Sequence, residues 1–244
     1  MNTENSTSFH MLHTVIKDDE NANDFWWQSE SLAQNVSLRL DLETFFQVTK
    51  IKIVFKWFLP KAMVIEKSMD FGKTWTPVKY IANDCSKSFK YFRAFQQGNR
   101  NELCKAIFYE LSSQPKSRND VTFYVVNSAQ LDEDITELTL ATNIRITLTE
   151  FQDLLLSNNS DSETKFFNNT QFYAISFVEI NGSCYCNGHA SRCVANDSIT
   201  EEVKAMVHPK CECDHHTTGE HCEQCEAMYN DQPWKPSYIS VTWI

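Results

Sequence analysis

The chain is short of glycine, of basic charge and of long apolar runs. Only 5 of its 244 residues are glycine, which argues against tight two-residue hairpins and favours longer connections bearing Asn and Asp. The net charge of −10 argues against a nucleic-acid partner, because neutralising phosphates requires clustered Lys and Arg. No apolar run approaches the roughly 18–20 residues of a spanning helix, so the sequence predicts no transmembrane segment.

Catalytic and targeting motifs are also missing. The sequence contains no His-Glu-x-x-His, no Gly-x-Ser-x-Gly and no glycine loop that could cradle a phosphate. Its seven histidines are scattered, and we therefore predict that the chain is not an enzyme. The N-terminus lacks the basic and apolar regions of a signal peptide.

Cysteine is abundant in one segment. Seven of the nine cysteines lie between residues 184 and 225, in the order C-x-C-x6-C-x17-C-x-C-x8-C-x2-C. Short polar loops between closely spaced cysteines are typical of a small domain stapled by disulfides in place of a large core. The aromatic residues lie almost wholly before residue 184. We therefore predict two domains, residues 1–183 and residues 184–244.

Oxidised cysteines imply a secreted protein. Six N-x-S/T sequons support this compartment and predict a glycoprotein, with candidate sites at Asn5, Asn35, Asn158, Asn168, Asn181 and Asn196. Secretion conflicts with the absence of a signal peptide. We resolve the conflict by expecting that the chain is incomplete at its N-terminus.

The first domain shows the period-2 alternation of half-buried strands. Val36, Leu38 and Leu40 alternate with polar residues, and a second run continues from Ile51 to Trp57. Further strands are expected at 62–66, 75–81, 121–126, 138–150 and 172–180, with a short helix permitted at Asp132–Glu137. Many short strands with polar connections indicate an all-β, jelly-roll type antiparallel sandwich. The segment 70–74 is predicted to be a hairpin connection. Trp57 and Trp75 are both expected to lie in the core.

Several motifs together resemble the laminin N-terminal domain followed by its first laminin-type EGF module. The resemblance covers residues 9 to about 237. Netrins share most of these motifs, but the doubled Trp26-Trp27 and the insertion 201–208 resemble laminin β subunits more closely. The motifs are Trp27–Glu30, Ala62–Trp75, Phe172–Ser176, Cys184–Cys193, Cys222–Cys225 and Tyr229–Trp234.

The resemblance implies a disulfide pattern that spacing alone could not choose. The implied pairs are Cys184–Cys193, Cys186–Cys211 and Cys213–Cys222, and Cys225 stays unpaired because no eighth cysteine follows it. Outside the module, Cys85 and Cys104 are expected to pair. The family also has more residues before the Trp-Gln-Ser-Glu motif, so strands of the sandwich are expected to be missing. His216 replaces the usual Asn of a turn and is less suited to positive φ.

Metal and anion sites are further candidates. The resemblance implies a structural Ca²⁺ near Asp18 and Asp19, with a main-chain oxygen from Ser176, against the alternative of a solvated acidic turn and no cofactor. A zinc site at Cys222 and Cys225, with His215, His216 and Cys211 or Cys213, is an alternative to disulfides. The lysines 50, 52 and 56 form either a solvated strand face or a site for sulfated glycans.

The functional prediction follows from the resemblance. We expect a secreted protein of the extracellular matrix and basement membrane, whose laminin β-like head binds the N-terminal domains of laminin α and γ chains in network assembly. Such a role would support cell adhesion, migration and tissue morphogenesis. One alternative is a netrin-like guidance ligand for a cell-surface receptor. Another is a truncated, nonfunctional product.

Overall fold

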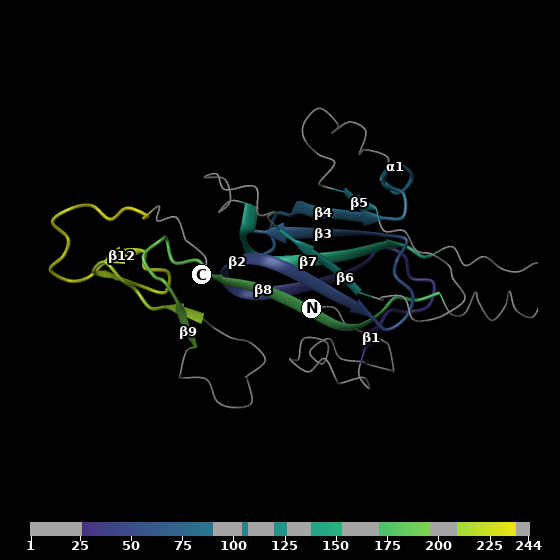
Figure 1. Cartoon of the computed structure of the whole chain (residues 1–244), viewed down its shortest axis with the longest axis horizontal. Coiled ribbons are helices and arrows are strands. Elements are labelled where there is room, and N and C mark those ends of the chain that lie inside the picture. Colours follow the sequence, from purple (N-terminus) through teal and green to yellow (C-terminus); the bar gives the residue numbers. More distant parts are fainter. Residues whose placement is uncertain are drawn as a thin grey trace, which may run out of the picture.

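The structure, a computed structural model, describes residues 26–89, 104–106, 120–125, 138–152, 171–195 and 209–237. One large sheet and a small cysteine-rich module make up these ranges (Figure 1). The sheet contains β1 (Trp27–Gln28), β2 (Val36–Phe55), β3 (Ala62–Ser68), β4 (Thr76–Ala82), β5 (Cys104–Ala106), β6 (Asp120–Tyr124), β7 (Leu140–Glu150) and β8 (Ala174–Cys184), with helix α1 (Cys85–Ser88) beside β4. The module contains β9 (Cys193–Ala195), β10 (Pro209–Cys211), β11 (Thr217–Thr218) and β12 (Gln224–Cys225).

Strand β2 connects two groups of strands. Its first half pairs with β7, which continues to β3, β4 and β5. Its second half pairs with β8 on one side and β6 on the other, and β8 continues to β1. A strand that changes partners in this way allows the sheet to fold over on itself.

A single apolar core lies between these two groups. Leu38, Ile65 and Ile146 come from the first group and Ile53 and Val178 from the second, yet all belong to one buried cluster. Inward-facing residues of facing strands interdigitate in this way in β-sandwiches. The predicted all-β class, with a sandwich head and a disulfide-rich module, is confirmed.

A bulge interrupts β2 where its two halves meet. The pairing with β7 shifts register between Asp41 and Phe46, and Glu43 has φ 64°. The backbone N–H of Glu43 donates to the Asp41 carboxylate at 2.9 Å. Bulges re-aim neighbouring side chains, and this one places Thr44 and Phe45 against the module.

The expected strands form, but two tryptophans differ from expectation. Trp57 is 47% exposed, because β2 ends at Phe55 and the alternation stops before it. Trp75 precedes β4 and is half-buried outside the apolar core, where the guanidinium of Arg145 lies 4.3 Å from the ring centroid. Both were expected in the core, and that expectation is wrong. The helix predicted at 132–137 lies outside the described residues.

The long connection after β4 begins with α1. The side chain of Asp84 caps this helix and accepts from the backbone N–H groups of Ser86 and Lys87. A disulfide joins Cys85 of α1 to Cys104 of β5. Within the described ranges, no helix has the length and apolarity needed to cross a bilayer.

Candidate functional site: the stapled module and its junction with the sheet

Disulfides hold the module together. The structure joins Cys186 to Cys211 and Cys213 to Cys222, which are two of the implied pairs. Cys184 is also disulfide-bonded. The side chain of its implied partner, Cys193, lies outside the described residues, so the Cys184–Cys193 pair stays a prediction. Cys222 and Cys211 are 0% and 2% exposed, so sulfur forms much of the module's small core.

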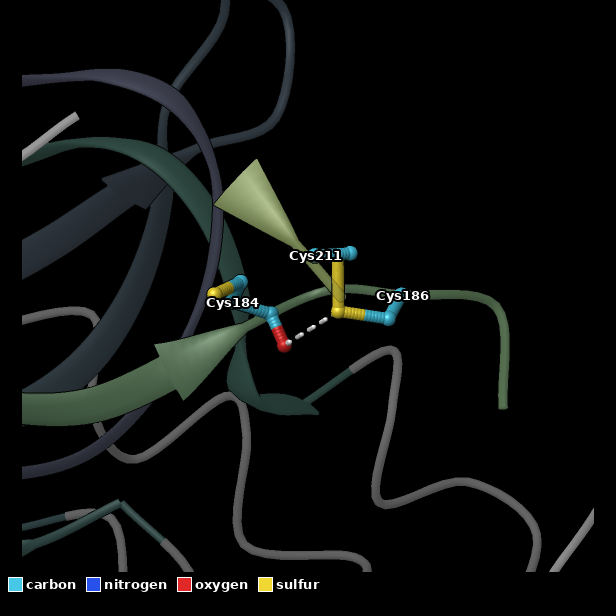
Figure 2. Close-up of side chains that lie close together, drawn as sticks. All are labelled: Cys184, Cys186 and Cys211. Carbon is cyan, nitrogen blue, oxygen red and sulfur yellow. Dashed lines mark hydrogen bonds between the residues drawn. A yellow bond between two sulfur atoms is a disulfide. The ribbon is translucent and has the colours of Figure 1, made fainter. Parts of the chain in front are cut away.

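Three sulfur atoms meet where β8 enters the module. The Sγ atoms of Cys184, Cys186 and Cys211 lie within 4.8 Å of one another. Figure 2 shows the Cys186–Cys211 bond beside the carbonyl of Cys184, 3.9 Å from Sγ of Cys186. All three cysteines are disulfide-bonded, and metals bind the thiolate form of cysteine. This cluster is therefore a structural staple.

Three of the four cysteines in the alternative zinc set have no thiolate to offer a metal ion. Cys211, Cys213 and Cys222 are disulfide-bonded, so Cys225 is the thiol that remains. Cys225 is free and half-buried in the structure. Its backbone pairs with Thr217 across the short β11–β12 ladder.

A histidine bridges the module and the sheet. His221 Nδ1 lies 2.9 Å from the carbonyl oxygen of Tyr185, and its Nε2 lies 2.9 Å from Oγ1 of Thr44. Since a carbonyl oxygen only accepts, Nδ1 carries the proton and the neutral ring accepts at Nε2. The ring also packs edge-on against Phe45, with centroids 5.8 Å apart. The bulge of β2 is thus the surface on which the module rests.

The connection between β3 and β4 supports this junction from the other side. Phe71 packs edge-on against Phe45 at 5.8 Å. Gly72 has φ 80°, a backbone conformation that glycine adopts without a steric penalty. The Asp70 carboxylate accepts from Ser68, Lys73 and Thr74. These hydrogen bonds, above all that of the Thr74 backbone, lower the pKa of Asp70 to about 2. The Asp70 carboxylate, held by these hydrogen bonds, therefore fixes the conformation of the loop.

Two of the six predicted glycosylation sites lie in described regions. Asn35 precedes β2 and Asn181 lies in β8, and both are exposed. Exposure satisfies a requirement for glycan attachment, and occupancy stays a prediction. Asn5, Asn158, Asn168 and Asn196 lie outside the described residues.

The three lysines of the predicted basic stripe, two on β2 and Lys56 just after it, each have a neighbouring side chain. Lys50 pairs with Glu179 at 3.3 Å. Lys52 lies 6.0 Å from the ring centroid of Phe177 and Lys56 lies 5.2 Å from that of Trp26. These neighbours favour the solvated-face interpretation over a site for sulfated glycans, which remains a prediction.

Of the residues predicted to bind calcium, only Ser176 lies in the part of the chain that the structure describes. Asp18 and Asp19 lie outside the described residues. Ser176 lies in β8, and its hydroxyl donates to the carbonyl of Val54 at 3.2 Å. A side chain tied to its neighbouring strand leaves the main-chain oxygen as the candidate ligand, so the Ca²⁺ site stays a prediction.

Sequence reasoning missed a small aromatic pocket at the end of the sheet. It is lined by residues that follow β2 and β7 and by residues that precede β8, including Trp57, Phe172 and Tyr173. Trp57 and Phe172 stack with centroids 6.4 Å apart. The Tyr173 hydroxyl is buried and has no hydrogen-bond partner among the described residues. No periodic signal points to this pocket, because its residues follow or precede their strands.

Known proteins resemble the chain over both of its parts. Residues 2–182 match the family described as Laminin N-terminal (Domain VI), and residues 184–237 match the Laminin/attractin EGF domain. Laminin subunit beta-1 from Homo sapiens is 35% identical over 93% of this chain and 13% of its own length. The Drosophila melanogaster beta-1 subunit is 37% identical over 89% of this chain and 12% of its own length.

A netrin also matches. Netrin-4 from Pongo abelii is 35% identical over 86% of this chain and 34% of its own length. The chain therefore spans a small part of these relatives. Among solved structures, a Clostridium perfringens chain titled CpGH89CBM32-6 aligns with a TM-score of 0.34 and 12% identity, over 67% of this chain and 81% of that one; a likeness this weak carries no functional argument.

The match to the N-terminal family covers most of the chain, and the match to the EGF domain begins where β8 ends. The motifs quoted from the sequence lie in both regions. The chain belongs to the laminin N-terminal (domain VI) family and carries a laminin-type EGF domain after that head.

Proposed function

We propose that this protein is a secreted, laminin β-like component of the extracellular matrix whose head takes part in network assembly in basement membranes. The observation that carries the proposal is the β-type match across head and module. The expected partners are the N-terminal domains of laminin α and γ chains. Cell adhesion, migration and tissue morphogenesis would follow from that assembly, without an enzymatic step.

The junction supports a rigid arrangement of head and module. His221 bonds to both Tyr185 and Thr44, and Asn187 donates to the His221 carbonyl at 2.8 Å. Bonds and ring contacts that fix both sides of a joint restrict its rotation. A rigid joint would present the head at a defined angle to partner chains, which lowers the entropy lost on assembly.

A glycan on Asn181 would cover part of the β2–β8 face of the head. A glycan on Asn181 would stand beside Lys50, its neighbour across the β2–β8 pairing, and its bulk would exclude partners there. The outer face of β3 and β7 carries Trp75 and Arg145, and Arg145 is bound to Glu66. Trp and Arg are enriched at the energetic centres of interfaces. We therefore place the partner surface on the β3–β7 face.

Mixing the secreted protein with α-type and γ-type N-terminal fragments tests the proposal. Size-exclusion chromatography with light scattering should show a ternary complex that depends on all three heads. Trp75→Ala should weaken the complex, and Lys52→Ala, on the opposite face, should not. If no complex forms at micromolar concentrations while both partners assemble with a known β head, the network role is wrong.

The runner-up is a netrin-like ligand for a cell-surface receptor, which the Netrin-4 match favours. Binding of the protein to cells, with no ternary complex in the mixing experiment, would support this alternative. Loss of cell binding after heparinase treatment would instead point to sulfated glycans as the partner.

A further inference from the structure

Two histidines of the module face each other through the same ring atom. Nδ1 of His189 lies 3.2 Å from Nδ1 of His215, and the rings are nearly perpendicular at 72°. Zinc–imidazole bonds of 2.0–2.1 Å at a tetrahedral angle place two ligand nitrogens about 3.3 Å apart. The pair therefore already has the spacing of two adjacent ligands on one metal ion.

A backbone carbonyl fixes the tautomer of His189. Its Nε2 lies 2.7 Å from the carbonyl oxygen of Lys235, and a carbonyl only accepts, so Nε2 carries the proton in the neutral ring. Nδ1 of His189 then has a free lone pair directed toward His215. Metal-binding histidines typically donate their other N–H to a backbone carbonyl or carboxylate. This second contact orients the His189 ring independently of its partner.

The scaffold around the pair is tightly held. The backbone N–H of Asp214, next to His215, donates to the His189 carbonyl at 2.6 Å. The Cys186–Cys211 and Cys213–Cys222 disulfides flank the two loops. Gly188 permits close approach of the segment that carries Lys235, since a Cβ there would lie 1.7 Å from the Ser237 carbonyl oxygen. Two ligands held in place lose little entropy on binding an ion.

We propose that His189 and His215 form a two-nitrogen chelate for a divalent transition-metal ion of the zinc type, with water completing its coordination. Without metal, Nδ1–H of His215 donates to His189. On binding, that proton moves through solvent to Nε2 of His215, so both Nδ1 atoms ligate as neutral imidazoles and no net proton is released. His215 is exposed and His189 is half-buried, so solvent reaches the pair, and the net charge of −10 favours cation approach. The site shares His215, but no cysteine, with the zinc set considered from the sequence, and it does not rest on the proposed function.

Calorimetric titration of Zn²⁺ into the oxidised protein tests the site. The background is Cys225→Ser, so that the free thiol cannot bind the metal. We expect one equivalent with micromolar affinity. Co²⁺ should give d–d bands without the thiolate charge-transfer band of a cysteine site. His189→Gln and His215→Asn should each weaken Zn²⁺ binding at least tenfold.

His216→Asn is the matched control. His215 and His216 have φ of 58° and 55°, and Asn tolerates this conformation, so both Asn variants are expected to fold. The His216 ring stacks on Tyr229, with centroids 3.7 Å apart, and is not part of the pair. His216→Asn should retain Zn²⁺ affinity. The proposal is overturned if the Cys225→Ser protein binds no Zn²⁺, or if the affinity is equal in the 215 and 216 variants; in that case the pair is a structural hydrogen bond only.

Discussion

At the scale of single residues, the conformation of the connection between β3 and β4 depends on the carboxylate of Asp70. Asp70 has a pKa of about 2 because hydrogen bonds from Thr74, Ser68 and Lys73 favour its charged form. An unfolded Asp titrates near 3.9. A depressed folded pKa contributes stability that is fully present above the unfolded value and is lost as pH falls toward the folded one. The Asp70 contribution should therefore disappear between about pH 4 and pH 2.

Asp70→Asn tests this. The variant should melt below the wild-type protein at pH 6, and the difference should shrink as pH falls toward 2. Circular dichroism melts across this range supply the measurement. Asp84, whose pKa is also about 2 because of hydrogen bonds from Ser86 and Lys87, provides a matched carboxylate away from the junction. A pH-independent difference for Asp70→Asn would contradict the assignment.

Tyr173 offers the opposite case, a polar atom without a partner. It is 2% exposed and its hydroxyl has no hydrogen bond among the described residues. Burial raises its pKa, since a phenolate would lose hydration. An unsatisfied buried polar group destabilises by about 1–3 kcal/mol.

Tyr173→Phe should thus leave the free energy of unfolding unchanged or raise it by about 1 kcal/mol. The ring contact with Phe151, at 4.4 Å between centroids, is kept. Urea denaturation of both proteins measures the difference. A loss of more than about 1 kcal/mol would show that the hydroxyl has a bound partner, such as water in the aromatic pocket.

At the scale of elements, the bulge in β2 decides how the module is held. Thr44 follows the register shift after Asp41, is half-buried and reaches His221 at 2.9 Å. Thr44→Val preserves shape and removes this bond, which should lower stability by about 1 kcal/mol. It should also widen the distribution of head–module angles.

Small-angle scattering and residual dipolar couplings measure those angles. Thr218→Val, at an exposed position of β11, is the control and should leave them unchanged. If Thr44→Val alters neither angles nor stability, ring packing of Phe45 on His221 alone holds the joint.

At the scale of the whole molecule, the head and the module are stabilised in different ways. The head has a continuous apolar core, and the module relies on sulfur bridges. The Cys186–Cys211 and Cys213–Cys222 bridges have sequence separations of 25 and 9 residues, and loops of this size correspond to about 3 kcal/mol each.

Reduction should therefore unfold the module and leave the head largely folded. Hydrogen exchange measured after dithiothreitol treatment should show loss of protection in residues 209–237 while β2, β7 and β8 remain protected. Before reduction, thiol titration of the native protein should find Cys225 reactive. Parallel loss of protection in head and module would contradict this difference in stabilisation.

Sequence reasoning and structure agree where a local pattern dominates. The alternation over Ile51, Ile53 and Phe55 predicted a buried strand face, and these residues are 0–2% exposed. The same pattern failed at Trp57, because a strand's end is set by the chain's path. The family resemblance supplied the Cys186–Cys211 and Cys213–Cys222 pairs, which spacing alone left open among many connectivities.

By itself, the sequence determined the all-β head, the cysteine-stapled module and the family. Strand periodicity and cysteine spacing are local properties, readable within a few residues. The tertiary structure decided the joint of Thr44 with His221, the exposure of Trp57 and the approach of His189 to His215. Each of these depends on residues that are distant in the chain. His189 and His215 are 26 positions apart, and Thr44 and His221 are 177 apart. No local sequence pattern predicts which loops the folded backbone brings together.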